Sequence, residues 1–146
     1  MVMVVPFSGG CACGTIRYEC SAPPIVASNC HCRDCQRASG SAFGSFLVVG
    51  VEAFQIRSGD PKFYRKVSDS GNPIERGFCS SCGSPVILRV PRRPKLVIIH
   101  AASLDDPSAH EPVMDIFTAS AQPWDRMDPD LQKFPAMPPY PESLGR

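Results

Sequence analysis

Hydrophobic residues along this chain fall in short runs that alternate with clusters of proline, glycine and small polar residues. Between residues 15 and 20, Ile16, Tyr18 and Cys20 alternate with polar neighbours, and this period of two is typical of a half-buried strand. Residues 25–28 are expected to be extended. Further runs of β type lie at 42–49, 53–56, 62–67, 74–78, 86–90, 96–99 and 113–117. Many short strands joined by such turns predict a mainly β fold.

At most one or two short helices are expected, and the clearest candidate is 33–39, with Gly40 as its terminator. Prolines are frequent beyond residue 120, and this segment cannot continue a central sheet because proline lacks the amide hydrogen. We expect an irregular arm that packs through Trp124 and Phe134 and frays at its last residues. Residues 1–146 are interpreted as one domain with a proline-rich C-terminal arm from about 120.

The balance of acidic and basic residues indicates which kinds of partner the chain can bind. Fifteen Lys and Arg residues against 14 Asp and Glu give a formal net charge of +1, which argues against nucleic-acid binding. The N-terminal stretch lacks the features of a signal peptide, and no run approaches the ~18 apolar residues of a membrane span. We therefore expect a cytoplasmic protein without a membrane partner. In a reducing compartment, eight cysteines in clusters indicate metal binding or catalysis rather than a disulfide framework.

Three of these cysteines, Cys30, Cys32 and Cys35, lie within six residues. Their thiolates would repel one another at close range unless a cation lay among them, and Zn²⁺ is the economical choice. Zinc takes four ligands in tetrahedral geometry, so three cysteines leave one position open. An open position is typical of a catalytic zinc site, because water or substrate can occupy it. The small residues at 38–42 favour an open cleft beside this site, although tight packing would explain them equally well.

A second group of cysteines is split between two knuckles. Cys11 and Cys13 are followed by Gly14, and Cys79 and Cys82 are followed by Gly83. A glycine at this point tolerates the tight turn through which backbone amides point at sulfur. Two half-sites of two cysteines make one closed four-cysteine zinc site, which is the usual structural arrangement. The sequence therefore predicts a structural zinc on Cys11, Cys13, Cys79 and Cys82 and an open zinc on Cys30, Cys32 and Cys35.

Other groupings stay open at this stage. Cys20 lies on the apolar face of its predicted strand and is interpreted as a buried inert thiol. Either Cys20 or His31 could instead complete the triad as a closed site. An iron–sulfur cluster would use the same ligand type, although the spacing matches none of the usual ferredoxin runs. His100 and His110 are interpreted as ordinary strand-end and loop residues.

Four segments together resemble a known family, the glutathione-dependent formaldehyde-activating enzymes, which also includes centromere protein V. They are Gly-Gly-Cys-Ala-Cys-Gly-Thr-Ile-Arg-Tyr at 9–18, Cys-His-Cys-Arg-Asp-Cys-Gln-Arg-Ala-Ser-Gly at 30–40, Phe-Cys-Ser-Ser-Cys-Gly-Ser at 78–84 and Ser-Leu-Asp-Asp-Pro at 103–107. The resemblance implies a zinc-anchored β-tent fold of short antiparallel strands. It also implies the same division into a four-cysteine structural zinc and a three-cysteine catalytic zinc.

The reaction that this resemblance implies is the addition of glutathione to formaldehyde, giving S-(hydroxymethyl)glutathione, classed as a carbon–sulfur lyase reaction in reverse. A thiol that enters the open position would lose its proton and become the nucleophile for formaldehyde or another small aldehyde. His31, Arg33 and Ser39 are adjacent candidates for the proton donor. Glutathione carries two carboxylates, for which Arg33, Arg37 and the turn at 92–95 offer cations.

The alternative function is a non-enzymatic, zinc-scaffolded binding module, whose triad zinc is closed by a further ligand. Chromatin or nucleic-acid association is suggested only by the centromeric relative, and the chain has no long basic stretch to support it. An accessible open position favours the enzyme, whereas a fourth protein ligand favours the module.

Overall fold

The computed structural model describes residues 3–139 and has a mainly β architecture. The smaller sheet contains three antiparallel strands in the order β1, β2, β5. Its strands are β1 (Phe7–Gly10), β2 (Arg17–Cys20) and β5 (Phe54–Ser58). The larger sheet has eight strands in the order β11, β10, β3, β4, β9, β8, β7, β6. Its strands are β3 (Val26–Cys30), β4 (Gly44–Gly50), β6 (Lys62–Val67), β7 (Pro73–Phe78), β8 (Pro85–Arg89), β9 (Leu96–His100), β10 (Met114–Ile116) and β11 (Gln132–Lys133).

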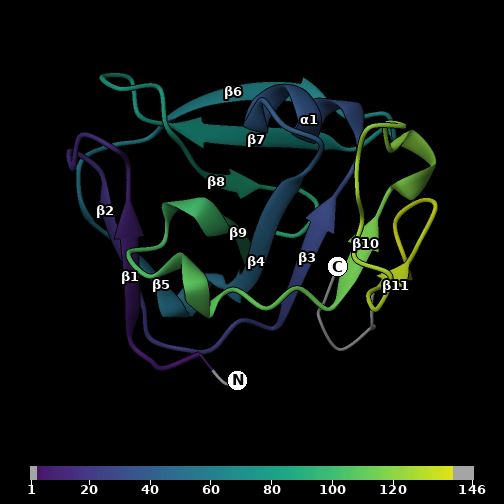
Figure 1. The fold of residues 1–146 in the computed structure, drawn as a ribbon. Helices are drawn as coiled ribbons and strands as arrows, with labels where there is room; N and C mark the ends of the chain where they lie inside the picture. The colour runs from purple at the N-terminus through teal and green to yellow at the C-terminus, as the bar shows by residue number, and fades with distance from the viewer. Residues whose placement is uncertain (1–2, 140–146) are drawn as a thin grey trace.

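The mainly β prediction is confirmed, with every expected run contributing to a strand (Figure 1). Strand β1 was missed, because its sequence Phe-Ser-Gly-Gly carries almost no β signal. Two pairings at one edge of the larger sheet also depart from the expected antiparallel pattern, because β10 runs parallel to both β3 and β11. Parallel neighbours require a long connection, and the chain returns to this edge through two 3-10 turns, Ala101–Ser103 and Pro107–Ala109.

The larger sheet is buried on both faces at its centre. On β4, Leu47 and Val49 belong to a core cluster shared with the smaller sheet, whereas Phe46 belongs to a second cluster around Cys30 and Cys35. Successive strand residues point to opposite faces, so one strand serves both clusters. The first cluster stabilises the contact between the sheets, and the second surrounds the cysteine triad.

The single α-helix among the described residues, α1 (Arg33–Ser39), has the predicted bounds. Cys32 is its N-cap and accepts a hydrogen bond from the Cys35 amide, at 3.3 Å. Gly40 ends the helix in the left-handed conformation, with φ 66°, where a side chain would be strained. The helix lies beside β6 and β7 in Figure 1, and Lys66 of β6 pairs with Asp34 at 2.5 Å. Among the described residues, no helix is long and apolar enough to span a membrane.

The C-terminal arm is partly as expected. Phe134 packs against the cluster around the triad, in agreement with the prediction. Trp124 was wrongly expected to anchor the arm, since it is 64% exposed. The arm is held instead by polar contacts described below and by the two residues of β11. The predicted frayed end lies outside the described residues.

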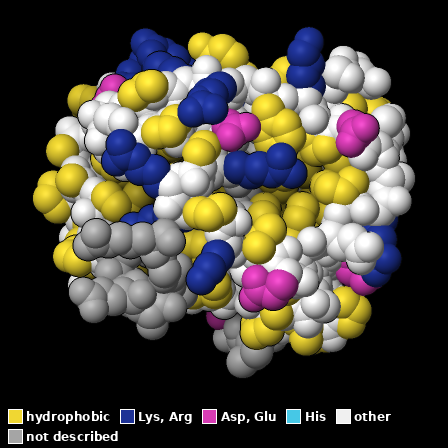
Figure 2. All heavy atoms as spheres, turned by 180° about the vertical axis from the view of Figure 1, so that it is seen from behind, with side chains coloured by type: hydrophobic (Ala, Val, Ile, Leu, Met, Phe, Trp, Pro, Cys, Tyr) yellow, Lys and Arg dark blue, Asp and Glu magenta, His cyan; other side chains and the backbone are white. Residues whose placement is uncertain are grey.

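The surface mixes side-chain types. Large hydrophobic residues are exposed at scattered positions, including Tyr64, Val67 and Val113. On the face seen in Figure 2, Lys and Arg side chains lie among hydrophobic and acidic ones.

His100 at the end of β9 provides a pH-dependent contribution to stability. The ring is 6% exposed and packs edge-on against Phe46, with a centroid distance of 4.8 Å. Burial, together with the positive charge of Arg76, lowers its pKa to about 4, so the folded state keeps the imidazole neutral well below its ordinary pKa of 6.5. Between pH 6.5 and about 4, unfolding is therefore accompanied by uptake of a proton at His100.

We expect the free energy of unfolding to fall by up to about 3 kcal/mol as pH drops from 6.5 to 4. Over this range His100 is protonated in the unfolded state but stays neutral in the folded state. In His100→Gln this component is absent, so the variant should show a shallower pH dependence in urea titrations. Acid also affects the cysteine clusters, but equally in both proteins. Parallel pH profiles for the two proteins would contradict the assignment.

Candidate metal centres

The triad forms where β3 passes into α1. Cys30 is the last residue of β3, Cys32 caps the helix, and Cys35 lies in its first turn. The three sulfur atoms lie within 4.8 Å of one another. Cys30 and Cys35 are 6% and 5% exposed, whereas Cys32 is half-buried. A tight strand-to-helix turn therefore brings three thiols of one short segment to one point.

The ionisation of these thiols favours a bound cation. The thiols of Cys30 and Cys35 donate hydrogen bonds to Cys32 and lower its pKa to about 2. Hydrogen bonds with Cys32 and Cys35 raise the pKa of Cys30, and burial raises it further. Without a cation the cluster therefore accommodates one thiolate sulfur, held by its neighbours. A cation that binds thiolates removes this restriction, so the donor set fits zinc.

The second cluster joins the two sheets. Cys11 and Cys13 lie in the connection between β1 and β2, and Cys79 and Cys82 lie in the turn between β7 and β8. The four sulfurs lie within 4.8 Å of one another. The Sγ of Cys13 is 3.6 Å from that of Cys11 and 3.8 Å from that of Cys79. Tetrahedral zinc with Zn–S bonds of about 2.3 Å separates its sulfurs by about 3.8 Å, so the spacing fits this metal.

Both knuckles have the local geometry that their glycines predict. Gly14 and Gly83 have φ values of 79° and 77°, in the left-handed region that side chains avoid. Their amides donate to the carbonyls of Cys11 and Cys79, at 3.1 Å and 2.8 Å. The Ile16 amide donates to the sulfur of Cys11 at 3.2 Å, a contact that stabilises thiolate over thiol.

Neither alternative ligand joins the triad in the described part of the chain, where no fourth His, Cys, Asp or Glu group lies with it. Cys20 is fully buried in the core between the sheets, and this burial raises the pKa of its thiol, as expected of an inert cysteine. His31 has both ring nitrogens occupied by carboxylates. Its Nε2 lies 2.9 Å from Asp115 and its Nδ1 lies 2.7 Å from Asp125.

These carboxylates, with Lys133, form a buried polar network that sequence reasoning missed. The side chains of His31, Asp115 and Asp125 are at most 3% exposed. Asp115 also forms an ion pair with Lys133, at 3.1 Å, and accepts a hydrogen bond from the side-chain amide of Asn29, at 3.3 Å. Asp125 and Lys133 belong to the C-terminal arm, so the network binds the arm to the residue between two triad cysteines. A single acidic residue in a loop gives no sequence signal of such a partner.

A cavity of about 190 Å³ adjoins the triad. Cys30, Cys32 and Cys35 form part of its wall. Most of the remaining wall is apolar and comes from the strands of the larger sheet; it includes Phe46, Val48, Ile74, Leu88, Ile98 and Ile116. The small residues at 38–42 were expected to open this cleft, but they do not line it. Ser39 and Ser41 line a separate hollow beside Cys11.

Arg76 of β7 is a basic residue in contact with the triad, and sequence reasoning did not select it. Its Nη2 lies 3.5 Å from the sulfur of Cys35, and its side chain lines the cavity. None of the three expected proton donors lines the cavity. His31 is enclosed by carboxylates, Arg33 donates to Gln36, and Ser39 donates to the carbonyl of Gln36 at 3.3 Å. Of the cations expected to bind glutathione, Arg93 lines the cavity.

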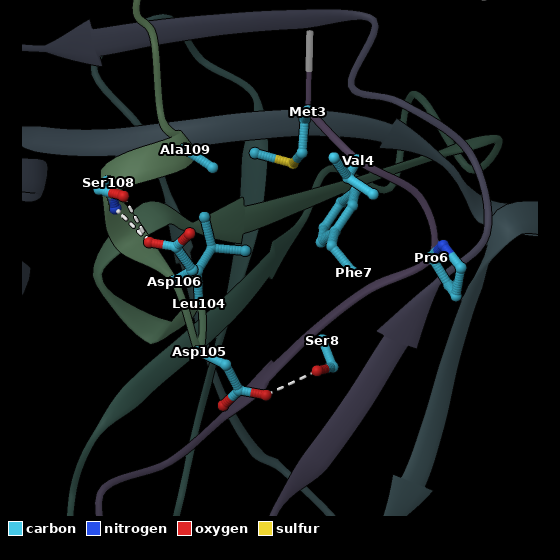
Figure 3. Close-up of a pocket in the computed structure, with 10 residues that line it drawn as sticks. All are labelled: Met3, Val4, Pro6, Phe7, Ser8, Leu104, Asp105, Asp106, Ser108 and Ala109. Carbon is cyan, nitrogen blue, oxygen red and sulfur yellow. Dashed lines mark hydrogen bonds between the residues drawn. The ribbon is translucent and has the colours of Figure 1, made fainter. Parts of the chain in front are cut away.

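A different cavity, of about 390 Å³, lies beside the N-terminal segment (Figure 3). Met3, Phe7 and Leu104 contribute to its wall, and no cysteine does. Asp105 accepts hydrogen bonds from Ser8, at 2.6 Å, and from Arg17 Nη1, at 2.8 Å. The Ser-Leu-Asp-Asp-Pro segment at 103–107 therefore connects to the smaller sheet, and none of its residues lines the cavity beside the triad.

Comparison with known proteins agrees with this geometry. A β protein with two separate cysteine clusters suited to zinc is the class that the fold and the site define. The model of the glutathione-dependent formaldehyde-activating enzyme family matches residues 6–120. The chain belongs to this family.

Individual relatives are more distant. A Halomonas elongata protein is 28% identical over 101 residues, covering 66% of this chain and 64% of that protein. A Penicillium rubens protein is 30% identical over 122 residues, covering 78% of this chain and 63% of that protein. Both are named "Putative glutathione-dependent formaldehyde-activating enzyme". The chain thus spans slightly less than two thirds of the length of each.

The fold has a counterpart among solved structures. A crystal structure of a Rhodobacter sphaeroides protein, a structural genomics target, matches with a TM-score of 0.54 at 18% identity. The match covers 67% of this chain and 87% of that one. At this identity, the likeness extends to the fold alone.

The buried network around His31 should contribute far more to stability than an exposed ion pair. We expect Asp115→Ala to lower the free energy of unfolding by about 3–5 kcal/mol, because it leaves Lys133 and the Nε2 atom of His31 without their buried partner. The matched control is Asp105→Ala, whose carboxylate pairs with Arg17 at the surface, where both side chains are more than a third exposed. That change should cost about 1 kcal/mol or less. Urea titration of both variants measures the difference, and equal costs would contradict it.

Proposed function

We propose that this chain is a zinc-dependent enzyme that adds the thiol of glutathione, or of a similar small molecule, to formaldehyde or another small aldehyde. In reverse this is a carbon–sulfur lyase reaction. The observation that carries the proposal is the convergence of three thiols, without a fourth protein ligand among the described residues, at the wall of a cavity. Family membership supports the same reaction.

In this proposal Cys30, Cys32 and Cys35 hold a catalytic zinc, and Cys11, Cys13, Cys79 and Cys82 hold a structural one. Zinc at the triad supplies Lewis acidity, which lowers the pKa of a thiol beside it. The Cys35 amide orients the sulfur of Cys32, and the cavity wall excludes water from the reacting groups. Arg76 presents a positive charge beside Cys35, where negative charge develops on the aldehyde oxygen.

The remaining assignments follow from the same picture. The chain acts as one domain, and Asp125 fixes its C-terminal arm to His31, the residue between two triad cysteines. All eight cysteines are free thiols in the structure, which suits a reducing compartment such as the cytoplasm. The partners are small molecules. The competing function, a binding module without catalysis, predicts metal sites but no acceleration of thiol addition.

Metal content tests the two sites. Protein purified without added metal should contain two zinc ions per chain by elemental analysis, and Cys32→Ser should contain one while keeping its fold. Cys82→Ser should fail to fold, because structural zinc binding contributes on the order of 10 kcal/mol of folding free energy. Circular dichroism checks the fold. Two variants that are equally unfolded would contradict the division into a structural and a catalytic site.

Exchange NMR with ¹³C-formaldehyde tests the reaction itself. The wild-type protein with both zinc ions should accelerate interconversion between free formaldehyde and S-(hydroxymethyl)glutathione, and Cys32→Ser should remove the acceleration. Cys20→Ala is the control, because this thiol is buried between the sheets, away from both clusters. An exchange rate that the zinc-loaded wild type leaves unchanged would overturn the enzyme proposal in favour of the binding module.

A further inference from the structure

The cavity beside the triad is larger and more apolar than formaldehyde requires. Its volume is about 190 Å³, whereas formaldehyde has two heavy atoms. Apolar cavities of about 150 Å³ in other proteins bind benzene. The space therefore accommodates a six-membered ring with a one-carbon substituent, and its apolar walls offer such a group a favourable transfer from water.

Strand β9 shows where a ligand would bind. It lies between β4 and β8 at the centre of the larger sheet, where apolar side chains are normally covered. Val97 and Ile99 point to one face and are 3% and 0% exposed. Ile98 points to the opposite face and is only half-buried, because that face opens into the cavity. Ile74 on β7 is half-buried there too. An apolar group in the cavity would cover both side chains.

Arg76 supplies the polar end of this site. Its Nη2 contacts Cys35, while its Nη1 is buried and has no hydrogen-bond partner among the described residues. A buried donor without a partner is unfavourable, because it has lost its hydrogen bonds to water without gaining another. A carbonyl oxygen is a strong acceptor, whereas a thiol sulfur is a weak one. The unmet donor beside the triad therefore favours a carbonyl compound as the occupant of the cavity.

Glutathione does not fit the same space. Its two carboxylates and its ammonium group would meet mostly apolar walls, and a buried charge without a partner is strongly unfavourable. The charged side chains of the wall are those of Arg76, Arg93, Asp34 and Asp69, so acidic and basic groups are equal in number and the wall offers the carboxylates of glutathione no net positive charge. The tripeptide therefore approaches from outside, with its sulfur alone reaching the triad.

We propose that the cavity binds the apolar body of an aldehyde of about the size of benzaldehyde, with the carbonyl oxygen on Arg76 and the carbonyl carbon facing the triad. This inference rests on the proposed thiol addition and names the class of its second substrate. A C–S bond forms at the carbonyl carbon as the π pair moves to oxygen, and the proton lost by the thiol ends on that oxygen. Arg76 stabilises the charge and stays protonated throughout.

Binding can be tested without catalysis. Benzyl alcohol, which has the ring but no carbonyl, should cause saturable shifts in the methyl NMR signals of Leu88 and Ile98 in the zinc-loaded protein. Ile98→Phe fills the space and should weaken binding at least about tenfold, with Ile74→Phe as a second variant if the first does not fold. Val51→Phe is the control, because Val51 is 44% exposed in the turn after β4 and does not line the cavity.

Kinetics assign the occupant. Ile98→Phe should lower kcat/KM for benzaldehyde at least about tenfold more than it lowers kcat/KM for formaldehyde, because only the larger aldehyde needs the apolar space. Arg76→Lys should lower kcat for both aldehydes about 10²-fold, because it removes a fixed donor to the developing oxyanion. It should leave the zinc content unchanged, a result that a purely structural role would not give.

Contrary results separate this inference from the proposed function. Addition to formaldehyde without benzyl alcohol binding would overturn the inference and leave the proposed function standing. If Ile98→Phe impaired phenylmethanethiol as substrate but spared benzaldehyde, the apolar group would belong to the thiol, and the inference would be wrong. Saturable benzyl alcohol binding without addition to either aldehyde would overturn the proposed function, and the substrate role with it.

Discussion

Repulsion between thiolates is the constraint on which the arrangement of this molecule depends. Seven of the eight cysteines converge in two groups, with the sulfurs of each group within 4.8 Å of one another. Such groups stay together as thiols that share protons or as thiolates around a cation, and the sulfur spacing of the four-cysteine group suits zinc. The knuckle glycines and the amides that point at sulfur prepare these positions before any ion arrives.

The larger sheet places the cysteine triad beside a cavity. One of its faces packs against the smaller sheet, and the other forms the apolar wall of the cavity that ends at the triad. Because β3 leads directly into α1, the triad lies at the rim of that wall. Arg76 reaches the same place from β7, so a strand that is distant in sequence joins β3 and α1 at one centre.

The sequence predicted the features that depend on local chemistry. Helix α1 and its Gly40 terminator, the mainly β architecture and the two cysteine groups all follow from residues close to one another or from strongly marked motifs. Features that depend on distant pairing were missed. Arg76 looks like any polar residue of a short strand, and nothing in its neighbourhood shows that β7 places it beside Cys35.

The C-terminal arm gives the same lesson. Trp124 was expected to anchor it because a large aromatic residue is usually buried, yet the neighbouring Asp125 does so through His31. Hydrophobicity can be read from a sequence, but the partner of a buried charge cannot, since that partner is set by the tertiary fold. The parallel pairing of β10 with β3 was missed for a related reason, because its register depends on a long connection.

The two cysteine groups also differ in how much chain must be ordered to assemble them. The triad lies within six consecutive residues, so an unfolded chain can already chelate an ion there. Cys13 and Cys79 are 66 positions apart, and they meet only after the two sheets have come together. An ion that binds both the folded and the unfolded chain stabilises the fold less than one that binds the folded chain alone. Zinc bound at both groups would therefore act on the folding equilibrium mainly through the distant group, and loss of an ion from the triad would cost less folding free energy.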